Sequence, residues 1–76
     1  MNDKRRKEVQ AVLDQLLELK ASVENLLEEE RNAYDNMPEG LQQATVGQAS
    51  EAAAAALEAA FDAIDDVESS LQEAMV

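Results

Sequence analysis

The stretch that reads DNMPEGLQ, residues 35–42, lies near the middle of the chain, between two long helical patterns. Pro38 has no backbone N–H, and its ring keeps the preceding residue out of the α region, so one helix cannot run through this stretch. Gly40 can adopt a positive φ without a steric cost, which suits a tight turn. We therefore expect the chain to fold back on itself here and to form two antiparallel helices.

The expected architecture is a single all-α domain, an antiparallel two-helix hairpin that covers residues 1–76. The first helix is predicted over residues 3–36, the turn over 37–44 and the second helix over 45–75. A lone hairpin of this size buries little apolar surface, and chains this small usually need a staple or a partner subunit.

The ends of both predicted helices carry recognisable signals. Asn2 or Asp3 can cap the first helix, because a short polar side chain accepts a hydrogen bond from a free N–H of the first turn. Thr45 and Gln48 have the spacing of a capping box at the start of the second helix. Gly47 either weakens this turn, by up to about 1 kcal/mol relative to alanine, or permits another segment to approach closely.

Apolar residues recur at alternating steps of three and four along both helices, which predicts one buried face on each. In the first helix the main stripe, interrupted by Glu30, is Val12, Leu16, Leu19, Val23, Leu26, Ala33 and Met37. In the second helix it is Val46, Ser50, Ala53, Leu57, Ala60, Ile64, Val67, Leu71 and Ala74. The first stripe is widened by Val9, Leu13, Leu17, Leu27 and Tyr34. One partner helix covers only a narrow seam, so we expect the chain to associate with itself as a homodimer or a higher oligomer, most simply as a homodimer that forms a four-helix bundle.

The composition argues against catalysis. The chain contains no Cys and no His, which excludes disulfides, thiolate metal sites and imidazole chemistry. It shows no nucleophile with a matched base, no glycine-rich phosphate loop and no metal-ligand motif, so we expect no enzyme, no cofactor and no metal. No apolar run approaches the roughly 20 residues that span a bilayer, and no signal peptide is recognisable, so we expect a cytoplasmic protein without a membrane contact.

Charge is the strongest compositional signal. Residues 1–7 carry four bases and one acid, a net of +3, whereas residues 8–76 carry two bases and sixteen acids, a net of −14. Such a surface repels nucleic acids and anionic lipids but attracts a basic protein surface. The basic residues 4–7 are expected beside Glu68 and Glu73 at the end of the second helix, in a charge pair that closes the hairpin or joins two subunits. A small nucleic-acid or partner contact is the alternative role for this cluster.

The candidate partner-binding residues are the exposed acids of the second helix, namely Glu51, Glu58, Asp62, Asp65 and Glu73. The alternative is that they are only solvated and keep the protein soluble.

The turn carries a resemblance to known proteins. The candidate turn motif consists of Asn36, Pro38, Glu39, Leu41 and Gln42, and Leu41 is expected to pack against the closed end of the hairpin. With Tyr34 before it and Thr45 and an acidic helix after it, the motif resembles a group of short uncharacterised phage and prophage proteins. These share an Asn-x-Pro-Glu-x-Leu-Gln turn between two acidic helices. The present chain differs from them in its alanine-rich second helix and in Gly40, where asparagine is usual.

The resemblance implies a phage-encoded protein that acts in the cytoplasm of a bacterial host. Small phage proteins often inhibit host machinery, so the leading hypothesis is a non-enzymatic protein that binds and modulates a host or phage protein through its acidic helical surface. Two alternatives remain open. One is a DNA mimic, because carboxylates one helical turn apart are spaced much like phosphates along a strand. The other is a purely structural oligomerisation module.

Overall fold

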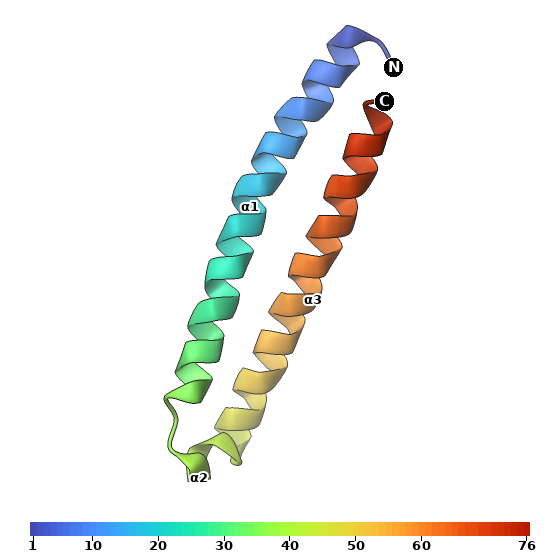
Figure 1. Cartoon of the computed structure of the whole chain (residues 1–76). Helices are drawn as coiled ribbons and strands as arrows, with labels where there is room; N and C mark the ends of the chain where they lie inside the picture. The colour runs from blue at the N-terminus through green and yellow to red at the C-terminus, as the bar shows by residue number, and fades with distance from the viewer.

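The computed structural model describes all residues, 1–76, and contains only helices. Their order along the chain is α1 (Asp3–Asp35), α2 (Glu39–Gln42) and α3 (Thr45–Ala74). Figure 1 shows α1 and α3 antiparallel and side by side, with both termini at one end and α2 at the other. The molecule is a rod with extents of 58 × 15 × 12 Å. The prediction of an all-α fold is confirmed, and the elongated shape fits the expected hairpin.

Helix α1 begins after Asn2, whose Oδ1 accepts a hydrogen bond from the Arg5 N–H at 2.8 Å. This bond satisfies one of the N–H groups that the first turn of any helix leaves unpaired. The helix ends at Asp35, one residue before the predicted end, and Asn36 is its C-cap. It therefore stops before Pro38, as the steric conflict between a proline and a preceding α-helical residue requires.

The predicted turn contains a short helix, α2, which was not expected from the sequence. Its first residue is Glu39, and the N–H groups of Leu41 and Gln42 both donate to the Pro38 carbonyl oxygen, at 2.9 and 3.1 Å. Gly40 lies inside α2, and no residue of the chain has a positive φ. Gly40 therefore does not use its freedom to adopt a positive φ, because the chain reverses through a turn of helix.

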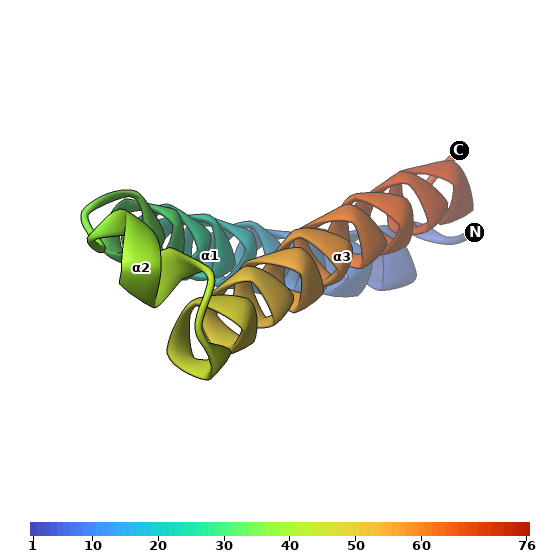
Figure 2. The same cartoon turned by 90° about the horizontal axis from the view of Figure 1, so that it is seen from below.

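Gln42 attaches the turn to α1, since its Nε2 donates to the Tyr34 carbonyl oxygen at 2.9 Å. Figure 2 shows α2 at the end of the hairpin, where it links the two long helices. Leu41 is 48% exposed, so the expectation that it closes this end of the hairpin is wrong. Consecutive residues of a helix point about 100° apart, so a turn that directs Gln42 toward α1 directs Leu41 away from it.

Helix α3 begins without a side-chain cap. Its N-cap residue is Ala44 rather than Thr45, so the expected capping box is wrong. The Ala44 carbonyl accepts the Gln48 N–H at 3.0 Å. Gly47 is buried because the backbone of Gln42 packs directly against it, and a Cβ at this position would overlap that backbone. Of the two roles considered for Gly47, the structure shows the close approach.

The two long helices pack along one seam, in which buried and half-buried residues recur at alternating steps of three and four. Helix α1 contributes Arg6, Val9, Leu13, Leu16, Lys20, Val23, Leu27, Glu30 and Tyr34. Helix α3 contributes Gly47, Ser50, Ala54, Leu57, Phe61, Ile64, Glu68, Leu71 and Met75. The predicted stripes share only part of this seam. Met37 is half-buried beyond the end of α1. The other members of the two main stripes are exposed beside the seam and form what we call the apolar face: Val12, Leu19, Leu26, Ala33, Val46, Ala53, Ala60, Val67 and Ala74.

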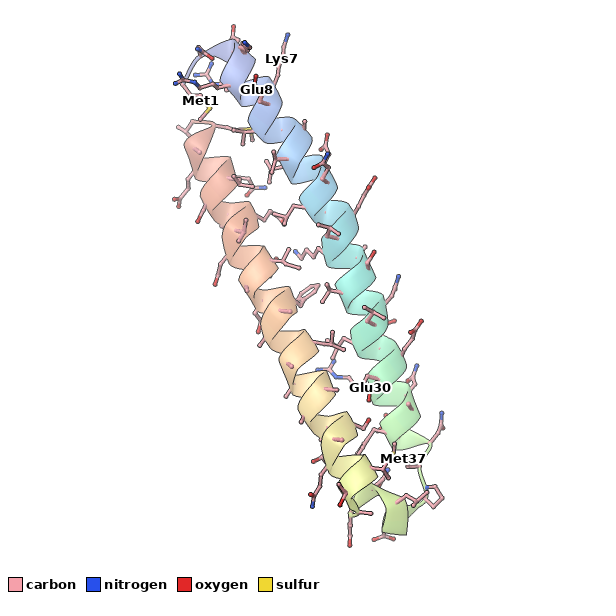
Figure 3. All side chains as sticks on the ribbon, turned by 180° about the vertical axis from the view of Figure 1, so that it is seen from behind. Met1, Lys7, Glu8, Glu30 and Met37 are labelled. Carbon is pink, nitrogen blue, oxygen red and sulfur yellow. The ribbon has the colours of Figure 1, made fainter.

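Polar residues explain why the hairpin uses this seam. The Ser50 hydroxyl donates to Oε1 of Glu30 at 2.7 Å, and Lys20 Nζ lies 3.4 Å from Oε2 of Glu68. Figure 3 shows Glu30 between the two helices. Polar residues in a helix–helix seam specify register, because each must meet a partner to avoid desolvation without compensation. On each long helix the apolar pattern consists of three columns of residues, and within one column the residues are seven positions apart. Two of these columns form the seam with the neighbouring helix, and the third is the apolar face.

The basic cluster closes the hairpin differently from the prediction. Arg6 Nε donates to the Met75 carbonyl oxygen at 3.1 Å, and its guanidinium pairs with Asp3 at 2.9 Å. No residue of the cluster forms an ion pair with Glu68 or Glu73 of the same chain, so the expected charge pair within the hairpin is wrong, and the pair between subunits stays a prediction. Figure 3 shows Lys7 projecting away from α3.

The core of the single hairpin is thin. Only two apolar side chains are buried, Leu13 at 3% exposure and Leu27 at 7%. The hairpin therefore leaves much of its apolar pattern exposed.

Neither long helix contains a segment that is apolar enough over a sufficient length to cross a membrane.

Candidate functional site

Charged side chains from both long helices meet on one side of the hairpin, which we call the polar face. Arg31, the residue after Glu30 in the seam, places Nη2 3.1 Å from Oε2 of Glu58, the residue after Leu57. Lys20 likewise pairs with Asp65, the residue after the seam residue Ile64. Residues that directly follow these seam positions in α1 and α3 therefore share one face, and the apolar face lies on the opposite side of the rod.

Two adjoining hollows on the polar face form a shallow groove toward the turn end, which we call the acidic groove. Both hollows are lined by Arg31 and Glu58. The first is also lined by Tyr34, Asp35, Glu51, Ala54 and Ala55. The second is also lined by Glu24, Leu27, Glu28, Phe61 and Asp62. Six carboxylates thus surround one guanidinium, which gives the lining a strongly negative potential.

The Arg31–Glu58 ion pair in the groove is exposed and contributes little to stability. The two side chains are 52% and 57% exposed. An exposed ion pair contributes only about 0–1 kcal/mol to stability, because water and salt screen it. A basic group from another protein can therefore take the place of Arg31 at little cost to the fold.

Tyr34 gives the groove one hydroxyl beside its carboxylates. The pKa of Tyr34 is raised, chiefly through hydrogen bonding to Glu51 and then through desolvation of the phenol. A tyrosine phenol is protonated at neutral pH and can donate a hydrogen bond within the groove, and the raised pKa extends this state to more alkaline solution.

The structure brings together some of the predicted partner-binding residues. Glu51, Glu58 and Asp62 line the acidic groove. Asp65 lies on the same face, where Lys20 engages it. Glu73 lines no part of the groove. The expected stripe of acids is exposed as a whole, but Glu58 and Asp65 are held in ion pairs within the chain.

Half of the groove carboxylates come from α1 and were missed in the sequence: Glu24, Glu28 and Asp35. A signal for them existed. Glu24 and Glu28 are four residues apart and therefore lie on one side of a helix. Whether that side of α1 lies next to the acids of α3 depends on which residues form the seam. The predicted seam was displaced toward the apolar face, so the prediction did not place Glu24 and Glu28 beside those acids.

Lys20 anchors the other half of the polar face. Its Nζ lies 5.1 Å from the centroid of the Phe61 ring and contacts both Asp65 and Glu68. The hydrogen bond to Asp65 is the largest cause of a raised pKa for Lys20, and Glu68 adds to it. The side chain of Lys20 is only 21% exposed, so its aliphatic stem packs in the seam while its ammonium reaches the polar face.

Stability is expected to fall at alkaline pH through two groups. The folded-state pKa values of Lys20 and Tyr34 are both raised. The folded chain therefore holds these protons more tightly than the unfolded chain. The contribution of the two groups to the free energy of unfolding is complete below pH about 10 and is lost as the pH rises through their folded-state pKa values. Thermal melts between pH 8 and pH 12 should show a melting temperature that falls above pH about 10. The fall should be shallower in Lys20→Met and Tyr34→Phe; equal slopes in all three proteins would contradict this assignment.

Comparisons with protein-family models, with curated proteins and with solved structures find no match to the chain.

Proposed function

We propose that the protein is a non-enzymatic interaction module that binds a basic protein surface at the acidic groove. The observation that supports this most directly is the convergence of six carboxylates from two helices around one exposed base, Arg31. A groove of this charge attracts lysine and arginine side chains and raises their rate of encounter. The resemblance of the turn to phage proteins makes a bacterial host protein or a phage protein the proposed partner.

We propose further that the module acts as a homodimer in which two hairpins form a four-helix bundle. The thin core supports this, because only Leu13 and Leu27 are buried apolar side chains in the single hairpin. Small domains with so little buried apolar surface are commonly stabilised by a partner subunit. In such a bundle the acidic groove stays on the outside, since it lies opposite the apolar face.

Binding should depend on the groove and not on net charge alone. The groove variant neutralises four of its carboxylates, as Glu24→Gln, Glu28→Gln, Glu51→Gln and Asp62→Asn. The control variant neutralises four acids outside the groove, as Asp14→Asn, Glu18→Gln, Asp66→Asn and Glu73→Gln. None of these eight side chains forms an ion pair. Both variants carry the same net charge and are expected to keep the helical circular dichroism of the wild type.

The measurement is capture of proteins from a bacterial lysate on each immobilised variant, followed by titration of the captured protein over a salt series. The groove variant should lose several-fold in affinity and show a flatter salt dependence, while the control variant should bind like the wild type. Equal losses in both variants would show that binding follows net charge. Unchanged binding in the groove variant would show that the groove carboxylates are only solvated. A captured protein that competes with DNA for binding would identify the module as a DNA mimic.

A further inference from the structure

We propose that the apolar face binds a second copy of this chain head to tail, so that the turn of each hairpin lies beside the open end of the other. This deepens the self-association proposed above and rests on it. What it adds is the face that is buried and the orientation of the two copies.

The apolar face collects most of the exposed large apolar side chains within the helices. Val12, Leu19 and Leu26 of α1 are 50%, 60% and 51% exposed. Val46 and Val67 of α3 are 53% and 47% exposed. A contiguous patch of this kind on a small protein marks an interaction site.

The α3 side of this face is free of charge. All members of the apolar face in α3 are Val or Ala. The neighbouring column, on the side away from the seam, consists of Ala49, Ala56, Ala63 and Ser70. Small side chains allow a facing helix to approach closely, and no charged group has to be desolvated when it does.

The exposed area matches what one more subunit would cover. The chain exposes 5401 Å². A folded monomer of 8.3 kDa is expected to expose about 4,600 Å². The excess of about 800 Å² equals the area that each partner buries in an interface of standard size.

The apolar face can pack against the same face of a second copy. Its members recur every seven residues on both helices, so a two-fold rotation places the row of residues on one helix against the same row of the second copy. In the head-to-tail arrangement α1 lies antiparallel to α1 of the second copy, with Leu19 at the centre of α1 and on the two-fold axis. Val12 then faces Leu26 of the second copy, and Arg5 faces Ala33, one turn from Glu29.

Charge decides between this orientation and its alternative. Residues 24–58, the turn end, carry eight acids and one base, a net of −7. Residues 1–9 and 68–76, the open end, carry four acids and four bases, a net of zero. Two copies with their turns at the same end would place both −7 segments against each other. Head-to-tail packing places them in opposite halves of a rod 58 Å long, so most of their charges lie further apart than the Debye length of about 8–10 Å.

Single cysteines test the orientation, because the chain has none of its own. Sedimentation equilibrium of the wild type should give twice the mass of 8.3 kDa. Under mild oxidation Leu19→Cys should form several-fold more disulfide-linked dimer than Leu17→Cys, its control on the polar side. The reason is that a disulfide needs Cα atoms within about 4.4–6.8 Å, which only residues at the two-fold axis satisfy.

Each of the other outcomes would contradict a different part of the proposal. If the turns lie at the same end, α1 faces α3, and a mixture of Leu19→Cys with Ala60→Cys should form a mixed disulfide while Leu19→Cys alone does not. That result would overturn the orientation. A dimer in which neither combination exceeds the Leu17→Cys control would overturn the choice of face. A wild-type mass of 8.3 kDa would overturn self-association itself and leave binding at the acidic groove to be judged by its own experiment.

Discussion

Replacing Gly47 with alanine is expected to lower the melting temperature by about 10 °C or more, because overpacking a tight site costs about 1–3 kcal/mol or more and each kcal/mol is worth about 4–8 °C in a domain of this size. A Cβ on Gly47 would overlap the carbonyl group and the Cα of Gln42. Gln42 cannot simply move aside. Its N–H is bonded to the Pro38 carbonyl oxygen, and its side chain is bonded to the Tyr34 carbonyl oxygen. The whole turn must therefore shift to make room.

Gly40→Ala is the matched control for this prediction. Nothing lies within 4 Å of the place that a Cβ on Gly40 would occupy, and its φ is not positive. Alanine favours helical backbone over glycine by about 0.5–1 kcal/mol, so this variant should melt at the wild-type temperature or a few degrees above it. Thermal melts followed by circular dichroism compare the two. If Gly47→Ala melts within a degree or two of Gly40→Ala, the close packing of the turn against α3 is wrong.

The two glycines also show what could be predicted about the turn. Pro38 is a covalent obstacle to a continuous helix, so the position of the chain reversal follows from the sequence alone. How the chain reverses does not. Gly40 is as free to enter a helical turn as to adopt a positive φ, and the packing of α2 on α3 decides between them. The same packing sets the start of α3 at Ala44, although Thr45 and Gln48 have capping-box spacing.

The helices and their apolar pattern were predictable, but the seam was not. Both long helices carry three columns of apolar residues, and spacing alone cannot tell which two columns face the neighbouring helix. The polar residues Lys20, Glu30 and Glu68 look like interruptions of a stripe when each helix is considered by itself. In the hairpin, Lys20 of α1 pairs with Glu68 of α3, and Glu30 of α1 accepts a hydrogen bond from Ser50 of α3. Pairing between helices is information that one-dimensional periodicity does not contain.

The displaced seam explains what was missed in the candidate site. The acids of α3 were predicted correctly as exposed residues, and Glu51, Glu58 and Asp62 line the groove. The contribution of α1 required knowledge of which of its sides lies beside those acids. With the observed seam, the rod has one charged side and one apolar side. This separation allows the two proposed interactions, one with a basic protein and one with a second copy, to occur at the same time.

Replacing Leu27 with alanine is expected to destabilise the hairpin by about 2–5 kcal/mol, the usual cost of truncating a buried leucine. The effect should be large because Leu27 and Leu13 are the only buried apolar side chains, so little else can compensate for the cavity. Leu17→Ala is the control: Leu17 is 45% exposed and lies outside the seam, so the same truncation should cost far less. Urea unfolding of the two variants gives the comparison, with similar m-values as the sign that the folded state is otherwise unchanged. A smaller loss for Leu27→Ala than for Leu17→Ala would show that α1 and α3 do not pack along the observed seam.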